Sequence, residues 1–188
     1  MNPGLVIDPV VSSVALAATS IITLTLALPK VARQDDQRQV VAGFDLLPHA
    51  LVAPFALVLP LVEITAALAS LLPATRSVGA AALAALFVLF ALALGINVAR
   101  GRTDIDCGCN GFRQPGAVVP HSIGWAHVAR TLLLAVLAAL VCMPQSARVV
   151  VWFDYLSVLA ATLVAVAAFF TLDVLLANRP KLNHLRNS

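Results

Sequence analysis

The chain has 188 residues, of which 61% are hydrophobic and only 11% are charged, and its mean hydropathy is +0.96. Soluble domains are about half apolar and about a quarter charged, so this composition indicates an integral membrane protein and excludes a secreted disulfide scaffold or a disordered tail. Twelve Lys and Arg against nine Asp and Glu leave a net charge of only +3. That balance does not predict the basic surface of a nucleic-acid binder.

Five stretches are long and apolar enough to form helices that span a bilayer. A hydrocarbon core of roughly 30 Å needs about 20 apolar residues per helix, and these stretches lack the alternating pattern of a barrel strand. We therefore expect an all-α, polytopic membrane bundle of about five transmembrane helices, forming a single transmembrane domain over residues 1–188. In chain order the stretches are Val10 to Leu28, Ala50 to Leu72, Ser77 to Val98, Trp125 to Met143 and Val149 to Ala177.

The connections between these stretches differ in length. Short turns at residues 73–76 and 144–148 predict that the stretches they join are antiparallel neighbours. Two longer connections, Pro29 to His49 and Ala99 to Gly124, are polar and hold most of the charge. Small residues in the third stretch, such as Gly79, allow close helix packing within one chain or between chains.

Lys and Arg are distributed unevenly between the two ends of the expected bundle. By the positive-inside rule this bias predicts that the N-terminus lies outside, the C-terminus inside and both long connections in the cytoplasm. The basic end carries Lys30, Arg33, Arg38, Arg100, Arg102, Arg113, Arg179, Lys181 and Arg186, and the other end carries Arg76 and Arg148.

Two of the three cysteines, Cys107 and Cys109, lie in the second long connection with only Gly108 between them. A Cys-Gly-Cys pair can close a very small disulfide ring, and strained, exposed disulfides exchange readily. Basic residues nearby favour the thiolate, although two aspartates in the same stretch oppose it. We interpret Cys107 and Cys109 as the catalytic pair of a thiol–disulfide exchanger.

Two alternatives remain for this pair. The thiols could be structural or inert, or they could be half of a metal site completed by His121 or His127. Zinc sites usually place cysteines about two to four residues apart and use four ligands, so the spacing favours exchange and we assign no metal. Cys142 lies at the opposite membrane face, and we interpret it as a buried, small apolar side chain.

Ionisable residues within the spans are costly in lipid and are therefore functional candidates. Glu63 lies near the middle of the second stretch, and Arg130 lies near the start of the fourth. We predict that these two residues form an ion pair; the alternative is that each faces a separate wet cavity. Asp173, near the end of the last stretch, is expected to face lipid headgroups.

Asn97 and His127 lie near the membrane edge that carries the cysteine pair. With Glu63 and Arg130 they form a set of intramembrane polar residues that are candidates for binding a cofactor. Each also has an ordinary interpretation, because Asn97 could make an interhelical hydrogen bond and His127 could be a polar group at the membrane edge.

Several motifs follow one another along the chain: Leu28-Pro-Lys-Val-Ala, Gly43-Phe-Asp-Leu-Leu-Pro48, Leu59-Pro-Leu-Val-Glu63, Ala99-Arg-Gly-Arg102, Asp106-Cys-Gly-Cys-Asn-Gly111 and the run from Trp125 to Arg130. Their order resembles the methylamine utilisation protein MauE family, whose members are relatives of DoxX-like membrane proteins. The resemblance covers about residues 10–143 and leaves an additional C-terminal helix at about 149–177.

The resemblance implies a role in maturing the small, disulfide-rich subunit of methylamine dehydrogenase in the periplasm, beside a thioredoxin-like partner, MauD. It also implies that Cys107 and Cys109 are the redox pair, that Glu63 and Arg130 are the intramembrane polar pair, and that the protein lies in the bacterial cytoplasmic membrane. By analogy only, a membrane quinone is a candidate electron acceptor. The family usually has an aromatic residue after the second cysteine, where this chain has Asn110.

The expected function is that of a membrane thiol–disulfide redox or maturation factor that assists disulfide formation in an exported protein. One alternative is a small transporter or channel in which Glu63, Asn97 and Arg130 line a polar path. Another is a non-catalytic scaffold for the thioredoxin-like partner. Disulfides are made outside the cytosol, whereas the charge bias places the cysteines inside. The topology could be inverted, the protein could carry electrons across the membrane, or the pair could be non-catalytic.

Overall fold

The computed structural model of the chain describes residues 6–106 and 123–186, with side chains up to Leu176. Over these residues the regular secondary structure is helical, with one isolated bridge between Ile7 and Gln145, which confirms the expected all-α class. The helices are α1 (Pro9–Ala32), α2 (Gln34–Phe44), α3 (His49–Leu71), α4 (Arg76–Ala99), α5 (Trp125–Leu140) and α6 (Trp152–Arg186).

Four of these helices are long and apolar enough to cross a bilayer: α1, α3, α4 and the part of α6 over Trp152–Leu176. Helix α5 is also apolar but has only 16 residues. At about 1.5 Å per residue it is about 24 Å long, which is shorter than a typical hydrocarbon core of roughly 30 Å. The prediction of a polytopic helical bundle therefore holds, with one apolar helix shorter than expected.

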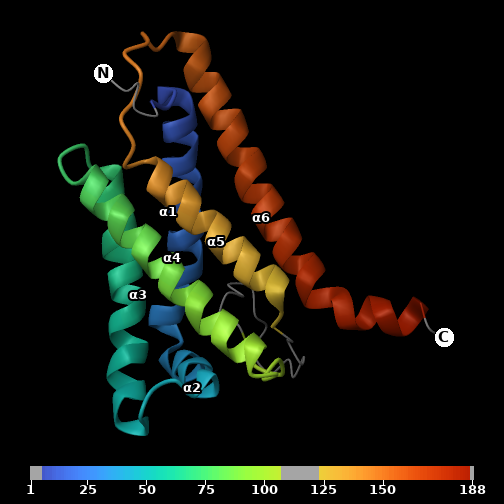
Figure 1. Ribbon diagram of the computed structural model, residues 1–188. Coiled ribbons are helices and arrows are strands. Elements are labelled where there is room, and N and C mark those ends of the chain that lie inside the picture. The colour runs from blue at the N-terminus through green and yellow to red at the C-terminus, as the bar shows by residue number, and fades with distance from the viewer. Residues whose placement is uncertain (1–5, 107–122, 187–188) are drawn as a thin grey trace.

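Helices α1, α3, α4 and α5 pack together, and α6 lies along α1 at the outside of this group (Figure 1). Helix α4 contacts both α3 and α5, and α1 contacts α3 and α5. Small side chains let helices approach closely where lipid offers no hydrophobic drive for association. The main core cluster contains Ile22, Ala66, Ala67, Leu83, Phe87, Leu134, Ala135, Ala138 and Phe169.

The closest approach between α3 and α4 is at Gly79. A Cβ atom at this position would lie 2.2 Å from the backbone nitrogen of Ser70, so only glycine fits. The hydroxyl of Ser70 lies 3.0 Å from that of Ser20, which joins α1 to the same contact. The small residue at Gly79 therefore serves packing within one chain.

One end of the bundle is closed by contacts between the start of α1 and the α5–α6 connection. Ile7 N donates to Pro144 O at 3.0 Å, and Arg148 Nε lies 3.0 Å from Asp8 Oδ2. Cys142 lies at this end, but it is exposed, so the expectation of burial was wrong. The reason is that α5 ends at Leu140 and leaves Cys142 in the turn that follows.

The other end, which we call the pocket end, carries α2. The sequence predicted only a polar connection between Pro29 and His49, but an amphipathic helix lies across the end of the bundle there (Figure 1). Helix α2 ends at Phe44 and is capped by Asp45, whose positive φ of 51° is a conformation that Asp tolerates better than most residues. Arg102 Nη1 donates to Asp45 Oδ2 at 2.9 Å, which ties the end of α4 to the end of α2.

Candidate functional site

An ion pair joins α1 to α3 near the pocket end. Lys30 Nζ donates to both carboxylate oxygens of Glu63 at 3.0 Å. The side chain of Glu63 is 4% exposed and that of Lys30 is 17% exposed. The position of Lys30 in the last turn of α1 places its positive charge near the negative end of the helix dipole. The carboxylate is therefore neutralised by a neighbouring helix inside the protein.

The predicted pair of Glu63 with Arg130 is wrong. Helix α3 packs against α1 and α4, so its carboxylate meets Lys30 on α1. Arg130 on α5 instead forms a buried ion pair with Asp173 on α6, and its guanidinium carbon lies 4.8 Å from the centre of the Phe169 ring. Asp173 is buried, which corrects the expectation that it faces headgroups.

Asn97 and His127 are both buried at the ends of helices. Asn97 Nδ2 donates to the carbonyl of Ala93 at 3.1 Å, while its Oδ1 has no hydrogen-bond partner among the described residues. The ring of His127, in the first turn of α5, accepts a hydrogen bond at Nδ1 from the backbone nitrogen of Gly124 at 3.3 Å. His127 therefore caps the start of α5, and Oδ1 of Asn97 is left without a partner among the described residues.

Cys107 and Cys109 lie outside the described residues. The residues on either side of their segment are described, and they meet, because Ile123 N donates to Thr103 O at 2.8 Å. Ile123 also belongs to an apolar cluster with Leu94 and Val128, against which Phe44, Val98 and Ile105 pack. The segment that carries the two cysteines therefore starts and ends at the pocket end of the bundle.

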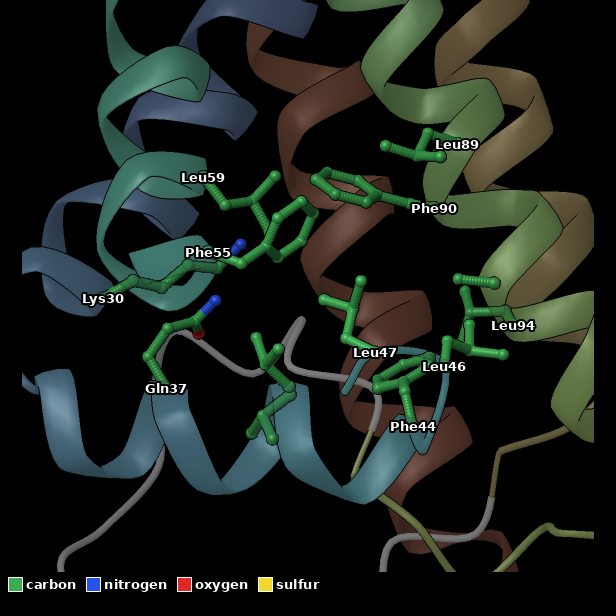
Figure 2. A pocket seen from close by; sticks show the side chains of 13 residues that line it. Lys30, Gln37, Phe44, Leu46, Leu47, Phe55, Leu59, Leu89, Phe90 and Leu94 are labelled. Atoms are coloured by element: carbon green, nitrogen blue, oxygen red, sulfur yellow. The ribbon is translucent and has the colours of Figure 1, made fainter. Parts of the chain in front are cut away.

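A pocket of about 200 Å³, which we call the α2 pocket, lies between α2 and the neighbouring parts of α1, α3 and α4 (Figure 2). Its two polar side chains are Lys30 and Gln37, and both are hydrogen-bond donors. Lys30 Nζ also lies 5.7 Å from the centre of the Phe90 ring. The remaining lining residues are Val40, Val41, Phe44, Leu46, Leu47, Phe55, Leu59, Leu89, Phe90, Ala93 and Leu94.

This arrangement suits a small, largely apolar molecule that carries hydrogen-bond acceptors. Ligand pockets in proteins are mostly apolar with a few polar groups that fix the orientation of the ligand. In the part of the chain that the structure describes, no three His, Cys, Asp or Glu side chains gather as metal ligands would. The chemistry available at the α2 pocket is therefore binding and orientation by Lys30 and Gln37.

Three residues of these sites were not identified from the sequence as site residues. In the sequence Lys30 is one of the basic residues of the connection after the first span, Gln37 falls in a polar connection, and Asp173 is predicted to face lipid headgroups. The one usable signal was the nearness of Lys30 to the end of an apolar helix, where a long side chain can reach into the membrane. The burial of Gln37 and Asp173 depends on how the helices pack, and no local pattern in the sequence indicates it.

Comparison with known proteins identifies the family. The family model described as "Methylamine utilisation protein MauE" matches residues 8–144, which contain α1 to α5. The curated protein of that name from Methylophilus methylotrophus is 45% identical over 132 residues, covering 70% of this chain and 67% of that protein. Those from Methylorubrum extorquens and Paracoccus denitrificans are 40% and 38% identical, covering 73% and 70% of this chain and 72% and 68% of theirs.

No solved structure matches the chain. The family match ends at residue 144, so α6, with Asp173, lies beyond it. The match does include Lys30, Glu63 and the lining of the α2 pocket. With this share of the chain matched, and with relatives this similar, the chain belongs to the methylamine utilisation protein MauE family.

Proposed function

We propose that the chain is a membrane thiol–disulfide redox factor of methylamine utilisation that assists disulfide formation in an exported protein. The curated relatives are named for methylamine utilisation, which supports the pathway. The small subunit of methylamine dehydrogenase is the proposed substrate, and a thioredoxin-like periplasmic protein of the MauD type is the proposed partner. Cys107 and Cys109 are the proposed redox pair.

The observation that carries the proposal is the contact between the described residues that come before and after the two cysteines. The hydrogen bond from Ile123 N to Thr103 O brings the two flanks of this segment together. Arg102, at the first flank, donates to Asp45 Oδ2 and to the carbonyl of Gly43 at 3.3 Å. These contacts hold the residues before and after the two cysteines at the pocket end, which supports a redox site at this end of the bundle, where a partner protein can reach it.

The proposed chemistry is thiol–disulfide exchange. A thiolate of Cys107 or Cys109 attacks a disulfide of the partner, so one sulfur–sulfur bond forms and one breaks, giving a mixed disulfide. The second cysteine then attacks the mixed disulfide and releases the partner as a dithiol. Two electrons pass from the cysteine pair to the partner, and the reverse sequence lets the oxidised pair make a disulfide in a substrate.

The first test replaces the pair and follows the thiols of the exported small subunit. In cells that carry the Cys107→Ser, Cys109→Ser double variant, we expect the small subunit to accumulate with free thiols, detected as mass added by an alkylating reagent. Cys142→Ser is the matched control, because this third cysteine is exposed at the opposite end of the bundle and should be dispensable. Full oxidation of the small subunit in the double variant would refute the exchange mechanism.

A second test addresses the side of the membrane. A Cys142→Ser variant keeps only Cys107 and Cys109 and can be labelled in intact cells with a membrane-impermeant maleimide. Labelling that requires prior reduction would support an oxidised pair on the outside and direct exchange in the periplasm. Labelling that requires permeabilised cells would instead support a pair on the inside, and would oblige electrons to cross the membrane to reach an exported substrate.

A further inference from the structure

Gln37 is a largely buried residue of α2 whose side-chain amide is free to meet a ligand. Its residue is 6% exposed, and its side chain makes no hydrogen bond with any described residue. In Figure 2 the amide points from α2 into the α2 pocket, on the side where Lys30 enters it. The pocket therefore presents two donors that a ligand with acceptor oxygens would satisfy.

The walls of the α2 pocket favour a flat, apolar body for this ligand. Three aromatic rings line it, those of Phe44, Phe55 and Phe90, together with aliphatic side chains. Phe55 on α3 and Leu89 on α4 line the pocket and are 36% and 48% exposed. Both helices are long and apolar enough to span a bilayer, so we expect lipid beside this part of the pocket. A ligand dissolved in the bilayer can enter by this route.

The same pocket shares side chains with the flanks of the cysteine segment. Phe44 and Leu94 line the pocket and also belong to the apolar cluster that contains Ile105 and Ile123. Ile105 precedes Cys107 by two residues in the sequence, and Ile123 follows the segment. A ligand in the α2 pocket therefore contacts the packing that anchors the proposed redox segment.

We propose that the α2 pocket binds the head group of a lipid-soluble quinone, with Lys30 and Gln37 donating hydrogen bonds to a carbonyl oxygen. As an electron acceptor for the cysteine pair, this role rests on the proposed function, whereas the binding itself rests on the pocket. Oxidation of two thiols to one disulfide releases two electrons and two protons, and a quinone takes up both when it becomes a quinol. The acceptor class thus matches the chemistry of the pair.

The test measures quinone binding directly. Decylubiquinone is titrated calorimetrically into the purified full-length protein in detergent micelles, with protein-free micelles as the blank. Gln37→Leu keeps the volume of the side chain and removes the donor, and we expect it to raise the dissociation constant roughly fivefold, as the loss of one hydrogen bond predicts. The matched control is Gln39→Leu, because Gln39 is the same residue type on the same helix but is exposed.

A second variant and a second probe keep the proposal falsifiable if Gln37→Leu fails to fold. Ala93→Phe fills the pocket from α4 and should abolish binding of decylubiquinone without removing a donor. Decylbenzene has the same tail but no carbonyl oxygens, and it should displace decylubiquinone weakly. Equal displacement by decylbenzene would mean that the pocket recognises only an apolar chain, and binding unchanged by Gln37→Leu or Ala93→Phe would place the quinone elsewhere. Each of these results overturns the proposal.

The binding test separates this proposal from the proposed function. It is repeated on the Cys107→Ser, Cys109→Ser double variant, which should bind decylubiquinone as the unaltered chain does. Binding there, combined with normal oxidation of the exported small subunit in cells, would sustain the pocket and refute the thiol-exchange function. No detectable binding by the unaltered chain would refute the pocket and leave thiol exchange to be judged by the alkylation test.

Discussion

Among the described residues, two largely buried ion pairs join apolar helices of the bundle, and they differ in what surrounds them. The pair of Arg130 and Asp173 is closed, with side chains 3% and 7% exposed and the Phe169 ring against the guanidinium. The pair of Lys30 and Glu63 borders the α2 pocket, and the ammonium group is one of the two polar groups that line it. The two ion pairs can therefore have different roles. A closed pair can only hold helices together, whereas a pair beside a pocket can also bind a ligand.

The two pairs also differ in what they connect. Lys30 and Glu63 both lie inside the region that the family model matches, residues 8–144. The closed pair joins Arg130, inside that region, to Asp173 on α6, beyond it. Helix α6 is the most peripheral of the spans, and the buried part of its span is the smallest among the four long apolar helices of the described residues. The closed pair is therefore an anchor for α6.

The largest expected loss of stability comes from removing one member of the closed pair, Arg130 and Asp173. Arg130→Met leaves the carboxylate of Asp173 buried without its partner, and loss of one member of a buried pair costs about 3 to 5 kcal/mol. The free energy of unfolding, measured by denaturant titration of the protein in detergent, should fall by that amount. The double variant Arg130→Met, Asp173→Leu should recover most of it, because it removes both charges. A double variant as unstable as the single one would show that the pair does not anchor α6.

A smaller loss of stability is expected at the pair that borders the pocket. Lys30→Met leaves Glu63 without its cation, but the Lys30 side chain is 17% exposed and the pair is less enclosed than the closed pair, so we expect a cost of about 1.5 to 3 kcal/mol, the range for a hydrogen bond to a charged group. The charge exchange Lys30→Glu, Glu63→Lys should restore part of the loss if the contact between α1 and α3 tolerates it. A cost for Lys30→Met equal to that for Arg130→Met, in the same titration, would remove the distinction between the two pairs.

The smallest effect is expected for a third pair, which is exposed. The side chains of Arg102 and Asp45 are 39% and 70% exposed, and surface pairs contribute about 0 to 1 kcal/mol. Arg102→Ala should therefore lower the free energy of unfolding by less than about 1 kcal/mol, and salt should weaken the contribution further. Repeating the denaturant titration at higher ionic strength checks this. The contribution of the exposed pair should fall, whereas the contribution of the closed pair should change little. A large, salt-insensitive loss would mean that the anchored segment stabilises the whole pocket end.

Much of the fold could be predicted because lipid imposes strong local requirements. A span must be apolar over about 20 residues and must satisfy its backbone internally, so α1, α3, α4 and α6 were found near their observed bounds. Helix α2 was missed because its residues are polar enough to resemble a connection. Its apolar side, with Val40, Val41 and Phe44, lines the α2 pocket, and this role is visible only in the tertiary structure.

The amino-acid sequence by itself determined the membrane class, the helical spans, the uneven charge of the two ends and the family, because each follows from composition, run length or motif order. Only the tertiary structure decided the partners: Lys30 rather than Arg130 for Glu63, and Asp173 for Arg130. A charged residue on a helix can meet any neighbouring helix, and the choice depends on the rotation and adjacency of helices that are distant in sequence. The burial of Gln37 arises in the same way, from packing of α2 against the end of the bundle.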